Sequence, residues 1–188
     1  MRIHLFRHGQ TSWNKQQLLQ GQTDISLDEE GQRQADGLTS YFAPLQLAAV
    51  YASGLARAQE TAHRATQSSY PIVTVSYFNE RSFGVLEGKP IEDLRGDLRL
   101  QLRDPAYCPE KGESHEMVER RVQQGIDEIV RSHRDTDEIA IFGHKGTNFH
   151  ILCKLIGVDE ARKYRAGDNC SGVLLLYAEQ CSVERRIP

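Results

Sequence analysis

Short apolar runs alternate with segments of helical spacing along most of this 188-residue chain. Apolar runs bounded by turn residues are typical of buried strands, whereas apolar residues three or four apart are typical of helices that cover a sheet. Strands are predicted at residues 3–6, 47–53, 71–75, 138–144 and 172–177, and helices at 26–42, 55–67, 91–102, 114–133 and 147–156. This alternation predicts an α/β fold, a three-layer α/β/α sandwich around a mostly parallel central sheet.

Serine residues stand where several of these helices are predicted to begin. Ser26 is followed three residues later by Glu29, which is the spacing of a capping box. Ser53 and Ser114 precede later helices and are available to cap them. The last residues, 181–188, show no clear pattern, so we expect an irregular tail there.

The length of the chain fits one domain with a sizeable buried core. The segment 77–112 interrupts the regular alternation, because it is rich in loop residues and has only one short helical stretch. We therefore expect a single domain over residues 1–188, in which 77–112 is a small helical and loop insertion beside the sheet.

Composition excludes several functional classes. The hydrophobic fraction of 39% and the charged fraction of 26% are typical of globular chains, and a net charge of −3 provides no general attraction for nucleic acid. No apolar run approaches the ~18 residues that a membrane span needs. The four cysteines, Cys108, Cys153, Cys170 and Cys181, form no CxxC pair, so we expect reduced thiols and a cytoplasmic location.

Charged and titratable residues follow the predicted strands. Arg7 and His8 end the first strand, Arg57 follows the second, Glu80 follows the third and His144 ends the fourth. Ligands of parallel α/β sheets bind beyond the carboxyl ends of the strands. These residues are therefore expected to meet at one edge of the sheet.

This set of side chains suits phosphoryl transfer. Arginine presents a fixed fork of donors that matches phosphate oxygens, and neutral histidine is a competent nucleophile near pH 7. A carboxylic acid can supply the proton that a leaving alkoxide needs. Because arginines can provide the positive charge, the chemistry requires no metal and no cofactor.

Five ordered segments resemble motifs of one known family. "RHGQTSWN" resembles the RHG signature of the histidine phosphatase superfamily, the phosphoglycerate-mutase-like proteins. "YASGLARAQETA" looks like the second arginine motif of that family, "NERSFGVLEG" its acid-bearing loop, "KGESHEMVERRV" its GES segment and "GHKG" its second histidine motif. The resemblance covers nearly the whole chain and implies a phosphatase or a mutase.

The resemblance implies a catalytic role for each strand-end residue. His8 would be the nucleophile that becomes phosphorylated. Arg7, Arg57 and His144 would surround the phosphoryl group and bind it. Glu80 would protonate the leaving oxygen and then deprotonate the attacking water.

The resemblance also implies a phosphate pocket built from the loop after the first strand. Asn14, Gln20 and Gly21 would complete this pocket, and Gln10 and Thr11 would contribute to it. The insertion 77–112 would lie over the cleft and select the substrate.

Some alternatives remain open at this point. Glu87 competes with Glu80 for the acid role, although a structural hydrogen-bonding role fits Glu87 better. Lys145, which follows the second histidine, either points to solvent or adds positive charge at the rim of the cleft.

The favoured function is a metal-independent phosphatase that hydrolyses phosphomonoesters of a small metabolite. A cofactor-dependent phosphoglycerate mutase, a phosphoprotein phosphatase and a binding module without catalysis are the alternatives. The loop "ERSFGVLEG" lacks the histidine-tyrosine pair and the following arginine pair of the mutases, which favours hydrolysis. The expected partner is a small phosphorylated metabolite, with no nucleic acid and no membrane, and monomer and dimer both stay open.

Overall fold

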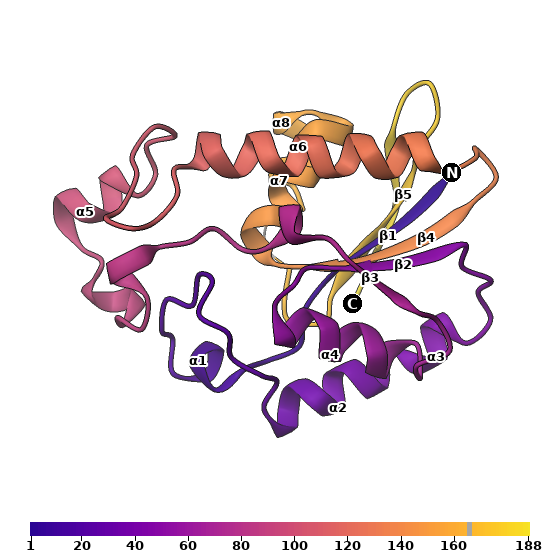
Figure 1. Cartoon of the computed structure of the whole chain (residues 1–188), viewed down its shortest axis with the longest axis horizontal. Coiled ribbons are helices and arrows are strands. Elements are labelled where there is room, and N and C mark those ends of the chain that lie inside the picture. The colour runs from indigo at the N-terminus through magenta and orange to yellow at the C-terminus, as the bar shows by residue number, and fades with distance from the viewer. Residues whose placement is uncertain (165–166) are drawn as a thin grey trace.

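A six-stranded sheet forms the centre of the computed structural model, which describes residues 1–164 and 167–188 (Figure 1). Its strands are β1 (Arg2–Arg7), β2 (Ala49–Ala52), β3 (Ile72–Thr74), β4 (Glu138–Gly143), β5 (Gly172–Leu176) and β6 (Ser182–Ile187). They lie in the order β3-β2-β4-β1-β5-β6. β1 to β4 pair in parallel, and β5 and β6 join antiparallel. The predicted α/β fold with a mostly parallel sheet is confirmed.

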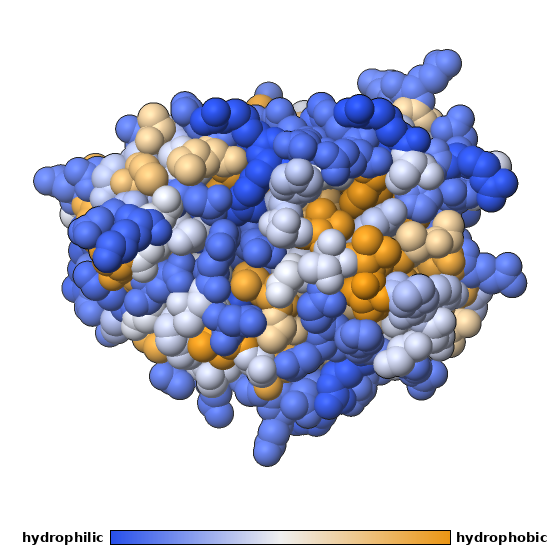
Figure 2. Space-filling view, in the orientation of Figure 1, coloured by the Kyte–Doolittle hydropathy of each residue, from blue (hydrophilic) through white to orange (hydrophobic). Residues whose placement is uncertain are grey.

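Helices cover both faces of this sheet (Figure 1). One face carries α2 (Glu29–Gly37), α3 (Thr39–Phe42) and α4 (Ala56–Ala65), and the other carries α6 (His115–Ser132), α7 (Lys145–Ile156) and α8 (Val158–Arg162). Within the described part of the chain, no helix is both long and apolar enough to cross a membrane. Figure 2 shows a mainly hydrophilic surface on this side, with hydrophobic residues gathered over the β2–β3 edge.

β1 is buried on both faces, and its side chains alternate between two hydrophobic cores. Ile3 and Leu5 belong to the core under α6 and α7, whereas Phe6 belongs to the core on the side of α2 to α4. Successive side chains of a strand point to opposite faces, and full burial of each contributes roughly 1.5–3 kcal/mol. The carboxyl end of β1 is therefore held firmly in the middle of the sheet.

The segment 77–112 lies beyond one end of the sheet (Figure 1). It begins within η1 (Ser76–Phe78) and contains α5 (Gly96–Gln101) and the short turns η2 (Gly84–Leu86) and η3 (Ile91–Asp93). Residues 88–91 hydrogen-bond to residues 17–19, which follow α1 (Ser12–Lys15). The N-terminal loop and the insertion thus lie against each other beyond the end of the sheet. The role of the insertion in substrate selection stays a prediction.

Two of the predicted helix caps are wrong. The N-cap of α2 is Asp28, whose carboxylate accepts from Gly31 N at 2.8 Å, so Ser26 lies outside the helix. Leu38 separates α2 from α3, where one helix over 26–42 was predicted. Ser53 does not cap α4, because Leu55 occupies the N-cap position.

The prediction for Ser114 is confirmed: it is the N-cap of α6, and its side chain accepts from Met117 N at 3.2 Å.

The prediction of an irregular tail is also wrong. Residues 182–187 form β6, which pairs antiparallel with β5 at the edge of the sheet. Polar side chains stay exposed on this edge strand, whereas Ile187 is 7% exposed and reaches the core. An edge strand buries few of its side chains, so the apolar alternation that predicts a strand was missing.

Candidate active site

The carboxyl ends of β1 and β4 lie side by side, and a histidine follows each strand. His8 N donates to Gly143 O at 3.0 Å, which extends the pairing of the two strands, and His144 comes directly after Gly143. The chain then leaves β1 toward α2 on one face and β4 toward α7 on the other (Figure 1). Such a switch in direction opens a crevice for ligands in α/β sheets.

His8 is buried, and its ring is oriented by the carbonyl oxygen of the next residue. Nδ1 lies 2.6 Å from Gly9 O. Because a carbonyl oxygen only accepts, we assign the ring proton to Nδ1, which leaves the lone pair on Nε2. Burial, together with the charges of Arg57 and Arg7, holds the pKa of His8 well below its usual value of about 6.5. The ring is therefore neutral and nucleophilic at neutral pH.

His144 is fully buried beside His8, with 5.1 Å between the ring centroids. Its Nε2 lies 2.6 Å from Ser53 Oγ, which also accepts from Leu55 N at 3.3 Å. We infer that the Ser53 hydroxyl donates its hydrogen bond to Nε2 of His144, so that the ring proton of His144 is on Nδ1. Burial, followed by the charge of Arg57, holds the pKa of His144 well below its usual value. Nδ1 has no hydrogen-bond partner among the described residues and can donate to an anion.

Two arginines add positive charge next to this histidine pair. Arg57, near the start of α4, is 1% exposed and donates to Thr23 O at 3.0 Å and Gly21 O at 2.7 Å. Arg7, the last residue of β1, donates to Gly167 O at 3.1 Å. The Nε atoms of both arginines are buried without a partner in the described part of the chain. A buried donor without a hydrogen-bond partner lowers the free energy of unfolding by about 1–3 kcal/mol, and a bound oxyanion would supply the missing acceptor.

Glu80 places a carboxylate in the same cleft. Its Oε1 accepts from Arg81 N at 2.9 Å, and its Oε2 accepts from Gly146 N at 3.0 Å in the first turn of α7. A Cβ atom at position 146 would lie only 2.4 Å from Oε1, so glycine leaves the room that this carboxylate occupies. Burial lowers the pKa of Arg7 and of Arg57, and the negative charge of Glu80 opposes that shift.

The carboxylate of Glu87 is engaged in hydrogen bonds with the N-terminal loop. Its carboxylate accepts from Gln22 N at 3.0 Å and Thr23 N at 2.8 Å. Gly21 has a φ of +55°, and a Cβ atom there would lie 2.1 Å from Glu87 Oε1. Glycine is thus needed at position 21 both for its left-handed backbone and for its lack of a side chain. Of the two competing carboxylates, Glu80 is the one that lines the cleft.

The structure divides the predicted phosphate-binding residues into two groups. Asn14, Gln20 and Gly21 line the cleft. Asn14 Oδ1 accepts from Thr11 N at 3.1 Å and Gln20 Oε1 accepts from Thr11 Oγ1 at 3.0 Å, so amide N–H groups are left to donate. Thr11 is fully buried and caps α1, and Gln10 is half-buried; neither is among the described residues that line the cleft.

The cleft has a volume of about 290 Å³ and continues beyond these residues. Its farther walls are mostly apolar and are formed by Leu18, Leu19, Phe83, Ile91, Val118 and Phe149. His115 and His150 lie there as well, with 5.8 Å between their ring centroids. Lys145 is exposed and lines the rim, so it both reaches solvent and adds charge at the entrance.

This arrangement agrees with the family comparison. The model of the histidine phosphatase superfamily (branch 1) matches residues 3–187. The chain belongs to that superfamily. Among its relatives, the uncharacterized phosphatase PhoE of Bacillus subtilis is 31% identical over 84% of this chain and 78% of PhoE.

A second histidine phosphatase relative is larger. Fructose-2,6-bisphosphatase TIGAR of mouse is 33% identical over 69% of this chain and 51% of its own length, so the chain spans about half of that relative. In structure, the alpha-ribazole phosphatase of Shigella flexneri matches with a TM-score of 0.87 over 100% of this chain and 96% of that one, at 24% identity. This likeness shows a shared fold.

Two residues that contact the candidate site were not predicted to do so from the sequence. Ser53 was interpreted only as a helix cap, yet its hydroxyl contacts His144. Asn169 was not considered, yet its Nδ2 donates to His8 O at 2.9 Å and contacts Asn14 Oδ1 at 3.3 Å. The "DNCSG" stretch before β5 carried this signal, because it leads into the strand that pairs with β1.

Proposed function

We propose that this protein is a phosphatase that hydrolyses phosphomonoesters of a small metabolite through a phosphohistidine intermediate on His8. One observation carries the proposal. The Gly9 carbonyl fixes the proton on Nδ1 of His8, so that the Nε2 lone pair is available in a cleft with Arg7 and Arg57. The similarity to PhoE, a phosphatase, and to TIGAR, a bisphosphatase, supports the same reaction class.

In the first step, Nε2 of His8 attacks phosphorus and the bond between phosphorus and the ester oxygen breaks. Arg7, Arg57 and His144 stabilise the charge on the three remaining oxygens. Glu80, entering the step as a carboxylic acid, gives its proton to the leaving oxygen, which departs as an alcohol. Asn14, Gln20 and Gly21 complete the pocket around the transferred group.

In the second step, water attacks the phosphohistidine. Glu80, now a carboxylate, takes a proton from this water while the phosphorus–nitrogen bond breaks. The electron pair of that bond returns to Nε2, and phosphate leaves. Each group of the site is then in its starting state, with the acid proton back on Glu80.

The charge in the farther part of the cleft favours hydrolysis over mutase chemistry. Arg7, Arg57, Arg81 and Lys145 are the arginine and lysine residues among the described residues that line the cleft. Arg81 donates from Nε, Nη1 and Nη2 to main-chain carbonyl oxygens, so its donors are engaged. Lys145 is then the cation left for a second acidic group, whereas a mutase has to hold a bisphosphorylated intermediate. We therefore favour a substrate with a single phosphate.

The test is phosphate release from a panel of sugar phosphates, phosphoglycerates, nucleotides and 4-nitrophenyl phosphate. We expect wild type to be active without added metal, and His8→Ala to fall to background. His63→Ala is the matched control, because His63 is exposed on α4. An acid-labile phosphoenzyme should form in wild type and not in His8→Ala.

Three results would overturn the proposal. An active His8→Ala variant would exclude His8 as the nucleophile. Rapid interconversion of 3- and 2-phosphoglycerate with a bisphosphate primer would establish a mutase instead. Preference for a phosphopeptide over every metabolite in the panel would identify a phosphoprotein phosphatase.

A further inference from the structure

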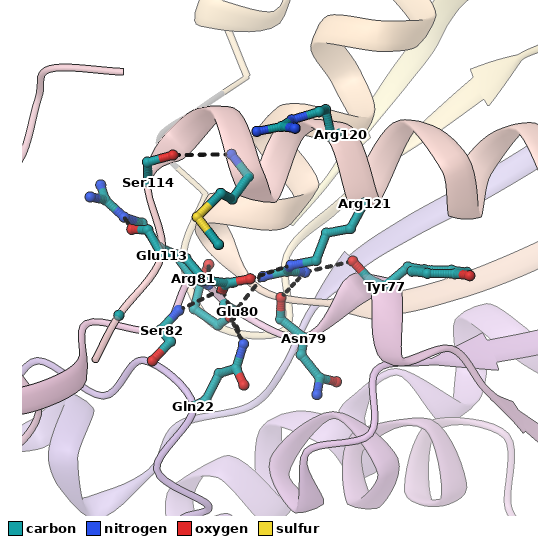
Figure 3. A network of polar contacts seen from close by, with 12 residues as sticks. Gln22, Tyr77, Asn79, Glu80, Arg81, Ser82, Glu113, Ser114, Arg120 and Arg121 are labelled. Atoms are coloured by element: carbon teal, nitrogen blue, oxygen red, sulfur yellow. Dashed lines mark hydrogen bonds and ion pairs between the residues drawn. The ribbon is translucent and has the colours of Figure 1, made fainter. Parts of the chain in front are cut away.

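One arginine of α6 binds the main chain of the loop that carries Glu80 (Figure 3). Arg121 Nη1 donates to Tyr77 O and Asn79 O, both at 2.6 Å, and Nη2 donates to Glu80 O at 3.1 Å. Nε and Nη2 also bind the two carboxylate oxygens of Glu113, each at 2.9 Å. A guanidinium has five N–H donors, and every one of them is used here.

Glu113 holds this arginine in place and binds the same loop. Its Oε2 accepts from Ser82 N at 2.9 Å and from Gln22 Nε2 at 3.1 Å. Gln22 Nε2 in turn donates to Glu80 O at 2.9 Å. The backbone on both sides of Glu80 is thereby fixed from α6 and from the N-terminal loop.

The ion pair at the centre of this network is sheltered. The side chains of Arg121 and Glu113 are each 17% exposed. Burial raises the pKa of Glu113, but hydrogen bonds from Arg121 and Ser82 and the charge of Arg121 outweigh burial and hold it below its usual range. The bidentate geometry and the charge make these hydrogen bonds stronger than those between neutral groups.

The side chain of Glu80 has less support of its own. Its carboxylate is held by two main-chain N–H groups, one of them in its own turn. A shift of the backbone at residues 79–82 would therefore move the carboxyl relative to His8. Proton transfer requires the Glu80 carboxyl to stay within hydrogen-bond distance of the leaving oxygen of the substrate.

We infer that Arg121, held by Glu113, is a positioning residue that sets the place of the Glu80 carboxyl for proton transfer. This inference rests on the proposed role of Glu80 as the acid. Within the described part of the chain, Arg121 makes no hydrogen bond to Arg7, Arg57 or His144, although, after burial, its charge contributes to the lowered pKa of His144. Arg121→Lys keeps that charge, so the loss of positioning is expected to show in proton transfer.

The test compares two substrates in single turnovers, measuring alcohol release. 4-Nitrophenolate leaves phosphate without a proton, whereas the alkoxide of an alkyl phosphate such as glycerol phosphate needs one. In Arg121→Lys, we expect alkyl phosphate cleavage to fall about 10- to 100-fold, as expected for partial loss of general acid catalysis. Cleavage of 4-nitrophenyl phosphate should change less than about threefold, because the phosphate pocket is intact.

Arg120→Ala is the matched control. Arg120 is the neighbouring residue of α6, it is exposed, and it points away from the network (Figure 3). This variant should leave both rates unchanged. Glu113→Gln is the milder second variant, to be used if Arg121→Lys does not fold; it should shift the two rates in the same unequal way.

Equal losses on the two substrates would overturn the inference, because they would indicate general damage to the site. Unchanged rates in both Arg121→Lys and Glu113→Gln would overturn it as well. Amide hydrogen exchange tests the same inference without measuring activity. The backbone amides of residues 79–82 should exchange faster in Arg121→Lys than in wild type, and unchanged exchange would contradict the positioning role of Arg121. Failure of the proposed function would look different, since wild type itself would then release no alcohol and form no phosphoenzyme.

Discussion

Ser53 Oγ lies 2.6 Å from Nε2 of His144, where β2 and β4 end next to each other. The contact depends on the register of the two strands, because Ser53 N also donates to Phe142 O at 3.0 Å. The hydroxyl fixes both the rotation of the buried ring and the nitrogen that carries its proton. A residue outside the cleft thus fixes which ring nitrogen of His144 carries the proton.

Ser53→Ala removes this control. The Nε2 atom of His144 would lose its hydrogen-bond partner in a fully buried place, which costs about 1–3 kcal/mol of unfolding free energy. We expect phosphatase activity to fall about tenfold or more, because the ring tautomer is no longer fixed. Urea unfolding and kcat/KM measure the two effects. Unchanged values of both would contradict the assigned proton on Nδ1.

The acid side of the activity profile tests the state of His8. Burial and the charges of Arg57 and Arg7 lower the pKa of His8, so the nucleophile stays neutral below its usual pKa of about 6.5. We expect kcat/KM for 4-nitrophenyl phosphate, which needs no proton, to persist as the pH falls from 7 to 6. A loss of activity with an apparent pKa at or above 6.5 would contradict a buried neutral His8.

The same burial makes the fold sensitive to acid. Burial is the main cause that lowers the pKa of His4, His8 and His144 in the folded state. Below about pH 6.5 the unfolded chain therefore binds more protons than the folded protein. The contribution of these histidines to the free energy of unfolding is complete above that pH and decreases as the pH falls. Glu87 and Glu113 have folded pKa values below their usual range, so their contribution is lost only below about pH 4.5.

Urea unfolding at pH 7.5 and pH 5.5 therefore reports on the histidines. We expect wild type to be less stable at pH 5.5, and His144→Asn to show a smaller difference between the two pH values. A wild-type protein of equal or greater stability at pH 5.5 would contradict this prediction.

Gly146→Ala separates the place of Glu80 from the stability of the fold. The new Cβ atom would displace the end of the Glu80 side chain, which is flexible, so the free energy of unfolding should change by less than about 1 kcal/mol. Single-turnover cleavage of alkyl phosphates should still drop about tenfold or more. Gly37→Ala, in α2, is the control, because a Cβ atom there meets nothing within 4 Å. Full alkyl phosphatase activity in Gly146→Ala would contradict the assigned acid.

The sequence predicts those parts of the site that depend on local patterns. Hydrophobic runs locate the ends of β1 and β4, and these ends bring the rings of His8 and His144 side by side. Arg57 and Glu80 follow other strands by a few residues, so they were also predicted at this edge. Their catalytic roles stay predictions.

Contacts between distant segments account for what was missed. Ser53 precedes a helix, which is a local signal for a cap, whereas its contact with His144 requires the register of two strands. No role was predicted for Arg121 from the sequence, because the face that it presents depends on how α6 packs against η1. The strand β6 was missed because edge pairing leaves little apolar pattern in the sequence.

Apart from the ion pair of Arg121 with Glu113, the hydrogen bonds of Arg81 and Arg121 with the acid-bearing segment go to carbonyl oxygens of the main chain. Arg81 binds those of Leu102, Tyr107 and Glu113, and Arg121 binds those of Tyr77, Asn79 and Glu80. A carbonyl oxygen is present whatever side chain stands at its position. The walls of the cleft can therefore be rebuilt for a new substrate, by design or by evolution, without relocating the proton donor.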